Sequence, residues 1–340
     1  MNFYDEAAVR SALPFDRLIP ALDRAFCQDY EIPQRLVLAL SDAPVTSLVM
    51  PAWQKSADID GRRYYGVKVI NIAPKNAALG IAALHAHYNL FDADTGQLLA
   101  LIEGGELTAR RTAASSALAA SKILKLKQTR RLSEQSERPK TLLIVGTGRI
   151  ASLLPAAYMN VLEFEKILVW GRDFGKAQQQ VARLQTELAA ELGPSRAHLA
   201  SIQIEAVQNI EEALGIADIV SCATLATEPV IQGALLAPHA HLDLIGSFTP
   251  LMREADDACF AQTALYVDSR EALTKSGDLI GPLQRGVFNA DNIAGTLESL
   301  CRPTALQHTI QGRSVFKSVG LALEDLAAAI LVFQSRECIN

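Results

Sequence analysis

The chain has 340 residues, 49% of them hydrophobic, and a formal net charge of −5 at neutral pH. This length suits two domains with sizeable cores, and an acidic balance without a basic stripe gives no reason to expect a nucleic-acid partner. No apolar run approaches the roughly 20 residues needed to span a bilayer, and the first residues lack signal-peptide features. Five scattered cysteines and six histidines show no disulfide or metal spacing, so we expect a cytoplasmic protein without a metal site.

The first third of the chain predicts a mixed α+β region. Its first element is a helix over residues 15–30, and its last is an alanine-rich helix over residues 106–126 that we expect to cross into a second domain. A turn at residues 92–96 closes a hairpin. The predicted strands cover residues 35–40, 46–53, 64–72, 85–91 and 98–103.

A dinucleotide-binding motif follows the charged segment at residues 129–140. The apolar run at residues 141–145 predicts a strand, and it ends in Gly146-x-Gly148-x-x-Ala151 before a helix-compatible segment. Gly146 permits the tight turn, Gly148 lets a pyrophosphate approach the backbone, and Ala151 keeps the helix close to the strand. We expect the unpaired N–H groups of the turn and helix start, over Gly146, Thr147, Gly148, Arg149 and Ile150, to bind the phosphates.

The remaining elements predict an α/β fold, a Rossmann-type doubly wound parallel sheet. A second strand covers residues 166–170, helices cover residues 175–192 and 210–214, and an apolar helix at residues 321–333 is expected to return to the first domain. Further buried strands are predicted at residues 202–207, 218–224, 241–247 and 265–269. The predicted domains are residues 1–121 with 317–340, and residues 122–316.

The end of the second predicted strand indicates which dinucleotide binds. Sites for NAD place an acidic residue there to accept hydrogen bonds from the ribose hydroxyls. This chain has Gly171 and Arg172, with Lys176 one turn further on, so a guanidinium is available for a 2′-phosphate. We therefore predict NADPH as the cofactor. Asp173, one residue beyond Arg172, keeps NADH as an alternative.

Three basic residues of the first region are candidates for binding an anion. Lys68 lies within an apolar strand, where alternation places it on the same face as Tyr64, Gly66 and Ile70. A lysine between valines is costly to bury unless an anion meets it. Arg35 begins a predicted strand, and Arg111 lies near a helix start. The alternative is that each is a surface charge, which is the usual location of lysine and arginine.

Five segments together resemble the ornithine cyclodeaminase/μ-crystallin family. They occur in the family's order and span nearly the whole chain, and the Leu-Thr-Ala-x-Arg-Thr-Ala-Ala block is the most specific of them. The segments are residues 66–71, 105–114, 145–148, 246–254 and 318–325.

The resemblance implies a homodimer built through the first domain and an active site in a cleft facing the nucleotide fold. It implies that Arg35, Lys68 and Arg111 hold the substrate carboxylate, with Arg111 also touching the cofactor. The family's cofactor path further implies roles for Thr112, Thr224 and Ser318, beside the glycine turn and Arg172.

One departure from the family pattern points to the reaction. Cyclodeaminases and archaeal alanine dehydrogenases of the family carry an aspartate shortly after the glycine that ends the fifth strand, whereas this chain has Phe248. The segment resembles instead the family's ketimine reductases, which reduce Δ1-pyrroline-2-carboxylate to L-proline and Δ1-piperideine-2-carboxylate to L-pipecolate. Asp243 lies inside the strand and is expected to face elsewhere.

The predicted reaction is therefore NADPH-dependent reduction of a small cyclic imino acid. Lys68 and Arg111 are the predicted catalytic residues, and an apolar wall from Met50 and Phe248 would exclude water. His85 and His87 are candidate proton donors, although a structural role is equally open. Two alternatives remain: an ornithine cyclodeaminase or alanine dehydrogenase-like activity, and a non-catalytic protein of the μ-crystallin type that binds NADPH and a small ligand.

Overall fold

The computed structural model describes residues 2–40, 45–128, 140–302 and 310–337. The predicted charged segment before the nucleotide motif lies largely outside these ranges. The chain divides into two compact units, unit 1 over Met1–Arg111 with Leu321–Asn340, and unit 2 over Thr112–Gly320. The sequence placed the boundaries at 121/122 and 316/317 instead. The first change of unit falls inside one continuous helix, α3 (Gly104–Gln128), which gives no local sequence signal of a boundary.

Unit 1 contains a largely antiparallel sheet, seven-stranded within the described ranges, in the order β1-β7-β6-β5-β4-β2 with β3 also paired to β4. The predicted bounds of β5 and β7 are confirmed, and those of the other predicted strands differ by one residue at one or both ends. The strands are β1 (Asn2–Tyr4), β2 (Tyr30–Glu31), β3 (Leu36–Ala39), β4 (Thr46–Gln54), β5 (Tyr64–Ile72), β6 (Leu84–Asp92) and β7 (Leu98–Glu103).

One face of this sheet is covered by helices. Residues along β5 alternate between buried and half-buried, and Tyr64, Gly66, Lys68 and Ile70 share one face as predicted; the structure shows that this face is buried. The helix α10 (Ala322–Glu337) packs on β4, β5 and β6 and on α2 (Phe15–Cys27), which confirms its predicted return to the first region. The remaining helical elements of unit 1 are α1 (Glu6–Ala12) and the 3-10 turn η1 (Pro74–Leu79).

Unit 2 contains a parallel sheet, eight-stranded within the described ranges, in the order β10-β9-β8-β11-β12-β15-β13-β14. The chain runs outward from β8 to β10 and then returns to place β11 on the other side of β8. This reversal confirms the doubly wound fold. The strands are β8 (Thr141–Val145), β9 (Lys166–Trp170), β10 (Gln203–Val207), β11 (Ile219–Cys222), β12 (His241–Leu244), β13 (Ala264–Val267), β14 (Gly295–Thr296) and β15 (Ser314–Lys317).

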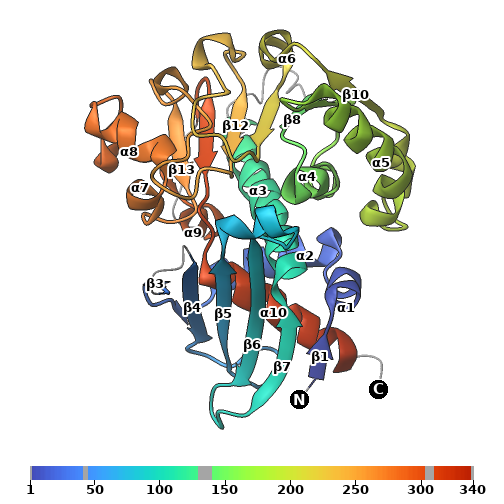
Figure 1. Cartoon of the computed structure of the whole chain (residues 1–340), viewed down its shortest axis with the longest axis vertical. Coiled ribbons are helices and arrows are strands. Elements are labelled where there is room, and N and C mark those ends of the chain that lie inside the picture. The colour runs from blue at the N-terminus through green and yellow to red at the C-terminus, as the bar shows by residue number, and fades with distance from the viewer. Residues whose placement is uncertain (1, 41–44, 129–139, 303–309, 338–340) are drawn as a thin grey trace. The chain divides into compact units, whose positions relative to one another are not determined.

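Burial on both faces explains why these strands are continuous apolar runs. Every residue of β8, β11, β12 and β15 is buried, as expected for a parallel sheet covered by helices. Helices α4 and α5 lie beside β8–β10, and α7 and α8 lie toward β13 (Figure 1). The helices are α4 (Arg149–Met159), α5 (Phe174–Leu192), α6 (Ile210–Ile216), α7 (Ala272–Lys275), α8 (Gly277–Gln284) and α9 (Leu297–Cys301).

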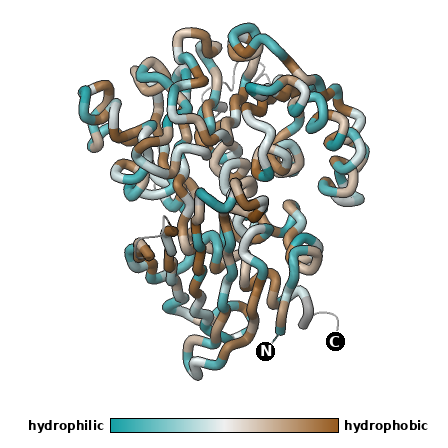
Figure 2. Tube along the Cα trace, in the orientation of Figure 1, coloured by the Kyte–Doolittle hydropathy of each residue, from teal (hydrophilic) through white to brown (hydrophobic). Residues whose placement is uncertain are grey.

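Hydrophobic residues run along the strands, and hydrophilic residues collect on outer helices such as α5 (Figure 2). The short 3-10 turns of unit 2 are η2 (Ala197–Ser201), η3 (Gly233–Leu235), η4 (Asp257–Cys259) and η5 (Ala290–Asn292). Within the described ranges, no helix has the length and apolar character needed to cross a membrane.

Two differences from the predicted strands concern the carboxyl edge of the parallel sheet. Strand β15, which lies between β12 and β13, was not predicted. Strands β11 and β12 end at Cys222 and Leu244, before the predicted ends at 224 and 247. The reason for the early ends is a side chain: the amides of Thr224, Gly246 and Ser247 donate to the carboxylate of Glu254.

Candidate active site

The glycine turn of unit 2 has the shape that a pyrophosphate requires. Gly146 has φ +130°, and a Cβ there would lie 2.5 Å from the carbonyl oxygen of Ala223. A Cβ at Gly148 would meet no atom within 4 Å, so the space above the turn is open. Helix α4 begins next to Gly148 without a side-chain cap, which leaves its first N–H groups available to an anion. The residues therefore fit a dinucleotide.

The next strand ends with the predicted basic group. A Cβ at Gly171 would lie 2.6 Å from Cγ2 of Thr147, so glycine is needed for β9 to pass close to the turn. Arg172 and Lys176 are exposed at this end. Asp173 caps α5, its carboxylate accepting from the Lys176 backbone N–H at 3.2 Å. Oδ1 of this carboxylate is thus engaged by the start of the helix.

Three other predicted cofactor residues occupy defined positions in unit 2. The N–H and hydroxyl of Thr224 donate to Glu254 Oε1 at 2.7 and 2.9 Å. Ser318 is buried directly after β15, and Thr112 is buried in α3. Thr224 and Ser318 follow parallel strands, so both lie at the carboxyl edge where doubly wound sheets bind nucleotides.

Unit 1 brings two of the predicted substrate residues into one buried ionic cluster. The Lys68 ammonium lies 2.5 Å from Oδ2 of Asp325. Arg111 donates from Nε to Asp325 Oδ1 at 2.8 Å, and from Nη1 to Glu324 Oε2 at 2.7 Å. All four side chains are buried. Asp325 therefore holds both cations at once, and the two carboxylates balance the two positive charges.

Burial changes the proton affinity of this cluster. It lowers the pKa of Lys68 to about 8, with repulsion from Arg111 adding to the effect and attraction by Asp325 opposing it. Burial also acts to lower the pKa of Arg111, but Asp325 and Glu324 outweigh it and the pKa lies above its usual value. Arg111 therefore stays charged, whereas the lowered pKa of Lys68 places its loss of a proton near pH 8.

Met50 and Arg35 are in register with Lys68 across strands β3, β4 and β5. Met50 pairs with Lys68 across β4 and β5, and its side chain is buried. Leu36 pairs with Val49, so the antiparallel register carries the preceding residue, Arg35, to the level of Met50. Arg35 is half-buried.

The histidines are wrongly placed for proton donation to a molecule bound at Lys68. Lys68 pairs with Tyr88 across β5 and β6, and Tyr88 is buried on the same face. His85 and His87 alternate with Tyr88 and point to the opposite, exposed face. The suggestion that they supply the proton is corrected by this geometry.

Two further predictions concern the end of β12. Asp243 faces away from the carboxyl edge, as predicted, because it accepts hydrogen bonds from Ser116 and Tyr158 at 3.1 and 3.0 Å and from Ser221. Phe248 is 43% exposed beyond β12, within unit 2.

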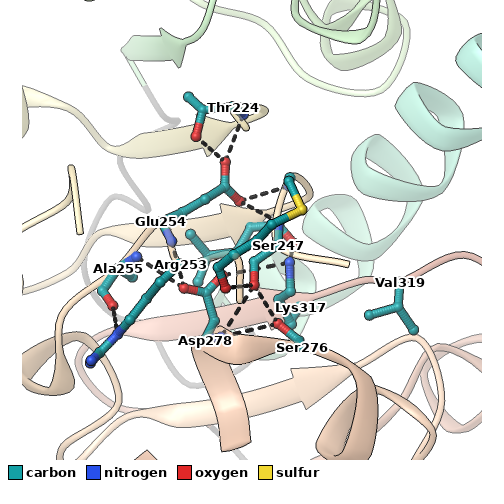
Figure 3. Close-up of polar contacts among 12 residues, drawn as sticks. Thr224, Ser247, Arg253, Glu254, Ala255, Ser276, Asp278, Lys317 and Val319 are labelled. Atoms are coloured by element: carbon teal, nitrogen blue, oxygen red, sulfur yellow. Dashed lines mark hydrogen bonds and ion pairs between the residues drawn. The ribbon is translucent and has the colours of Figure 1, made fainter. Parts of the chain in front are cut away.

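Sequence reasoning missed the acidic members of both units' buried networks. Glu324 and Asp325 were visible as acidic residues in an otherwise apolar helix, and this contrast was the available signal. Tyr88 was not singled out, although its hydroxyl is buried against Gly66 and has no hydrogen-bond partner among the described residues. Glu254, inside the segment that resembles the family, organises the network of Figure 3. Among the described residues, no group of three or more His, Cys, Asp or Glu side chains is placed to hold a metal ion.

These features define a two-unit α/β protein, in which a Rossmann-type sheet with an open glycine turn is joined to a second unit that buries a lysine–arginine–carboxylate cluster. Residues 3–338 match the ornithine cyclodeaminase/mu-crystallin family. The chain belongs to this family, as its motifs predicted.

Three relatives illustrate the similarity. A Δ1-pyrroline-2-carboxylate reductase of Paracoccus denitrificans is 38% identical over 310 residues, which cover 90% of this chain and 89% of that protein. The ketimine reductase mu-crystallin of Mus musculus is 31% identical over 290 residues, 84% of this chain and 79% of that protein. The structure of Thermococcus litoralis Δ1-pyrroline-2-carboxylate reductase in complex with NADH and L-proline matches with a TM-score of 0.84 at 27% identity, covering 100% of this chain and 98% of that one.

Proposed function

We propose that this protein is a nicotinamide-dependent cyclic ketimine reductase that prefers NADPH. Its substrates would be Δ1-pyrroline-2-carboxylate, reduced to L-proline, and Δ1-piperideine-2-carboxylate, reduced to L-pipecolate. The names of the relatives above support this reaction class, and one bound NADH and L-proline. The observation that carries the proposal is the buried cluster of Lys68, Arg111, Glu324 and Asp325.

The charge of that cluster suits the chemistry of the substrate. A protonated cyclic imine with a 2-carboxylate is a zwitterion of zero net charge, and the cluster is also neutral because two cations face two carboxylates. Lys68 and Arg111 would bind the substrate carboxylate with charge-assisted hydrogen bonds, and Arg35 would add a third cation. Asp325 would keep both cations oriented, and it offers a counter-charge for the iminium.

Unit 2 would bind the hydride donor. The N–H groups at the start of α4 would hold the pyrophosphate, and Arg172 would bind the 2′-phosphate. When bound, the reduced nicotinamide supplies the hydride for the imine carbon. The iminium carries its own proton, so the protein's work is to orient both partners and exclude water. Phe248 stands where the family's cyclodeaminases carry an aspartate, and it provides an apolar surface without a base.

We also propose that the protein is a homodimer. The face of the unit 1 sheet that alternates with the buried Lys68 face carries half-buried apolar side chains from three adjacent strands, β4, β5 and β6. They are Val49, Trp53, Tyr65, Val67, Val69 and Phe91. A contiguous apolar face of this kind marks a protein interface. Light scattering should give twice the mass of the chain for the wild type, and Val67→Glu should shift the mass toward the monomer; a monomeric wild type would contradict the proposal.

The reaction is tested by following the absorbance of the reduced nicotinamide with each imine and with NADPH or NADH in parallel. We expect rapid oxidation, faster with NADPH. No oxidation with either cofactor would reject the reductase. Turnover of ornithine to proline would then identify a cyclodeaminase. Tight binding of NADPH and a small ligand without any turnover would identify a binding protein.

A further inference from the structure

A buried carboxylate at the carboxyl edge of the parallel sheet joins two strand ends. Glu254 is completely buried. Its Oε1 accepts from the N–H and hydroxyl of Thr224, and its Oε2 accepts from the N–H groups of Gly246 and Ser247 at 2.7 and 3.3 Å (Figure 3). Three of these four donors are backbone N–H groups, which cannot accept a hydrogen bond, so the geometry favours an ionised carboxylate even though burial raises the pKa of Glu254.

The packing around Glu254 leaves little freedom for the backbone. A Cβ added to Gly246 would collide with the carbonyl oxygen of Thr224 and lie 2.5 Å from Glu254 Oε1. The neighbouring Arg253 N–H donates to the carbonyl of Ala226 at 2.7 Å, so the loops after β11 and β12 run together. Glu254 therefore fixes the position of both loops relative to the sheet.

Two further buried groups connect Glu254 to the end of β15. Asp278 Oδ1 accepts from the N–H groups of Glu254 and Ala255 at 2.7 and 3.0 Å. Lys317 Nζ lies 3.6 Å from Asp278 Oδ2 and donates to the Leu244 carbonyl at 3.1 Å. We call Glu254, Asp278 and Lys317 the edge cluster.

The edge cluster has a net charge of −1, since two carboxylates face one ammonium. Asp268 adds a further buried carboxylate, which accepts from the N–H groups of Val319 and Gly320. In the described part of unit 2, Lys317 is the one lysine or arginine that is buried to this degree. An excess of negative charge in a low-dielectric interior is costly, so it favours a nearby cation.

The dinucleotide of the proposed function supplies such a cation during the reaction. In a doubly wound sheet the two halves of a dinucleotide lie over the two halves of the sheet, on either side of the switch point. With Gly146 and Arg172 on the β8–β9 side, the nicotinamide half belongs over β11 and β12. A hydride carries two electrons to the iminium carbon, the C=N π pair moves to nitrogen, and the positive charge passes from the substrate to the nicotinamide.

We propose that Glu254 is a positioning residue for this transfer: it fixes the loops after β11 and β12, and its edge cluster favours the oxidised, cationic nicotinamide. This inference rests on the proposed nicotinamide-dependent function. It assigns to Glu254 a role through the backbone and through charge, without contact with the reacting atoms.

The test combines hydrogen exchange with cofactor affinities in Glu254→Gln. The glutamine amide turns an N–H donor toward groups that are themselves donors, so the amides of Thr224, Gly246 and Ser247 should exchange at least about tenfold faster. The dissociation constant of NADP⁺ should rise about tenfold more than that of NADPH, because one negative charge is lost. The matched control is Asp257→Asn, whose carboxylate pairs with Arg253 and Arg285 near the surface and should change neither readout.

Asp278→Asn removes a negative charge from the edge cluster without changing the contacts that hold the two loops. It also replaces Glu254→Gln as the test if that variant does not fold. Asparagine keeps the oxygen that accepts from Glu254 and Ala255, so the three amides should stay protected while the NADP⁺ to NADPH affinity ratio still shifts. Equal changes for the two cofactors in both variants would overturn the inference, as would unchanged exchange in a folded Glu254→Gln protein. Neither readout needs turnover, so a wild type that reduces no imine would reject the proposed function while these measurements still decide the role of Glu254.

Discussion

The two units bury charge in opposite ways. In unit 1, Lys68 and Arg111 are matched by Glu324 and Asp325, so the cluster is neutral. In unit 2, Glu254 and Asp278 share the single ammonium of Lys317, so the edge cluster is negative. A neutral cluster of oriented charges is suited to a zwitterion, whereas a negative one is suited to a group that becomes cationic. Under the proposed function, unit 1 would hold the zwitterionic substrate, and unit 2 would stabilise the nicotinamide when it becomes cationic.

The largest expected effect comes from removing a cation from the neutral cluster. Lys68→Met should lower kcat/KM for Δ1-pyrroline-2-carboxylate about a thousandfold, since losing one partner of a buried charged interaction costs about 4 kcal/mol. The affinity for NADPH should change little. Steady-state kinetics and fluorescence titration measure the two effects.

Two observations accompany that variant. Lys55→Met is the control, because Lys55 forms a surface ion pair with Glu31 in the same unit and should leave kcat/KM unchanged. In the wild type, kcat/KM should also decline above about pH 8, where Lys68 loses its proton. Full activity in Lys68→Met would remove Lys68 from the mechanism. It would also contradict the assignment of the neutral cluster of unit 1 to substrate binding.

The next largest effect concerns a buried carboxylate of unit 2, whose raised pKa makes the unfolding free energy depend on pH. Burial raises the pKa of Asp243 from 3.8 to about 6, although hydrogen bonds from Ser221, Tyr158 and Ser116 act to lower it. At a pH between 3.8 and about 6, Asp243 has lost its proton in the unfolded chain but keeps it in the folded protein. The stability contributed by this group is therefore complete below the unfolded pKa and is lost as the pH rises to about 6. Two pKa units correspond to about 3 kcal/mol.

Urea unfolding of Asp243→Asn against the wild type measures this effect. Between about pH 3 and pH 7, the wild type should lose on the order of 3 kcal/mol more unfolding free energy than the variant. Asp257→Asn provides a control of opposite sign, because the hydrogen bond from Arg285 lowers the pKa of Asp257. If the unfolding free energy of Asp243→Asn and of the wild type changed with pH in parallel, the pKa of Asp243 would not be raised in the folded protein.

The smallest expected effect concerns the exposed rim of unit 2. Arg172→Ala should weaken NADPH by about tenfold to a hundredfold, the loss of one charge-assisted phosphate contact, and should leave NADH nearly unchanged. Arg183→Ala is the control, since Arg183 lies on α5 and pairs with Glu187 at the surface. Dissociation constants for both cofactors decide the matter: equal weakening of NADPH and NADH would contradict the assigned phosphate contact.

Local sequence patterns were sufficient for most elements that carry the site. Alternation over residues 64–72 grouped Lys68 with Tyr64, Gly66 and Ile70 on one face of β5, and the structure shows that face to be buried. The apolar run before Gly146 predicted β8, the turn and α4 in their observed order. These features depend on side-chain period and turn chemistry within about ten residues, which a sequence displays directly.

The partners of those residues could not be predicted from local patterns. Strand β15 is four residues long, and its insertion between β12 and β13 depends on the topology of the whole sheet. The early ends of β11 and β12 depend on Glu254, which is distant in sequence from Thr224. A short strand and a buried acceptor leave no periodic signal.

By itself the sequence determined the family, the doubly wound sheet, the glycine turn and the strand face on which Lys68 lies. Only the tertiary structure decided that Asp325 holds Lys68 and Arg111 together, that His85 and His87 face away from them, and that Glu254 joins two strand ends. The physical reason is that periodicity fixes the face on which a side chain lies, whereas the match of buried charges is set by which distant segments the fold brings within a few ångströms.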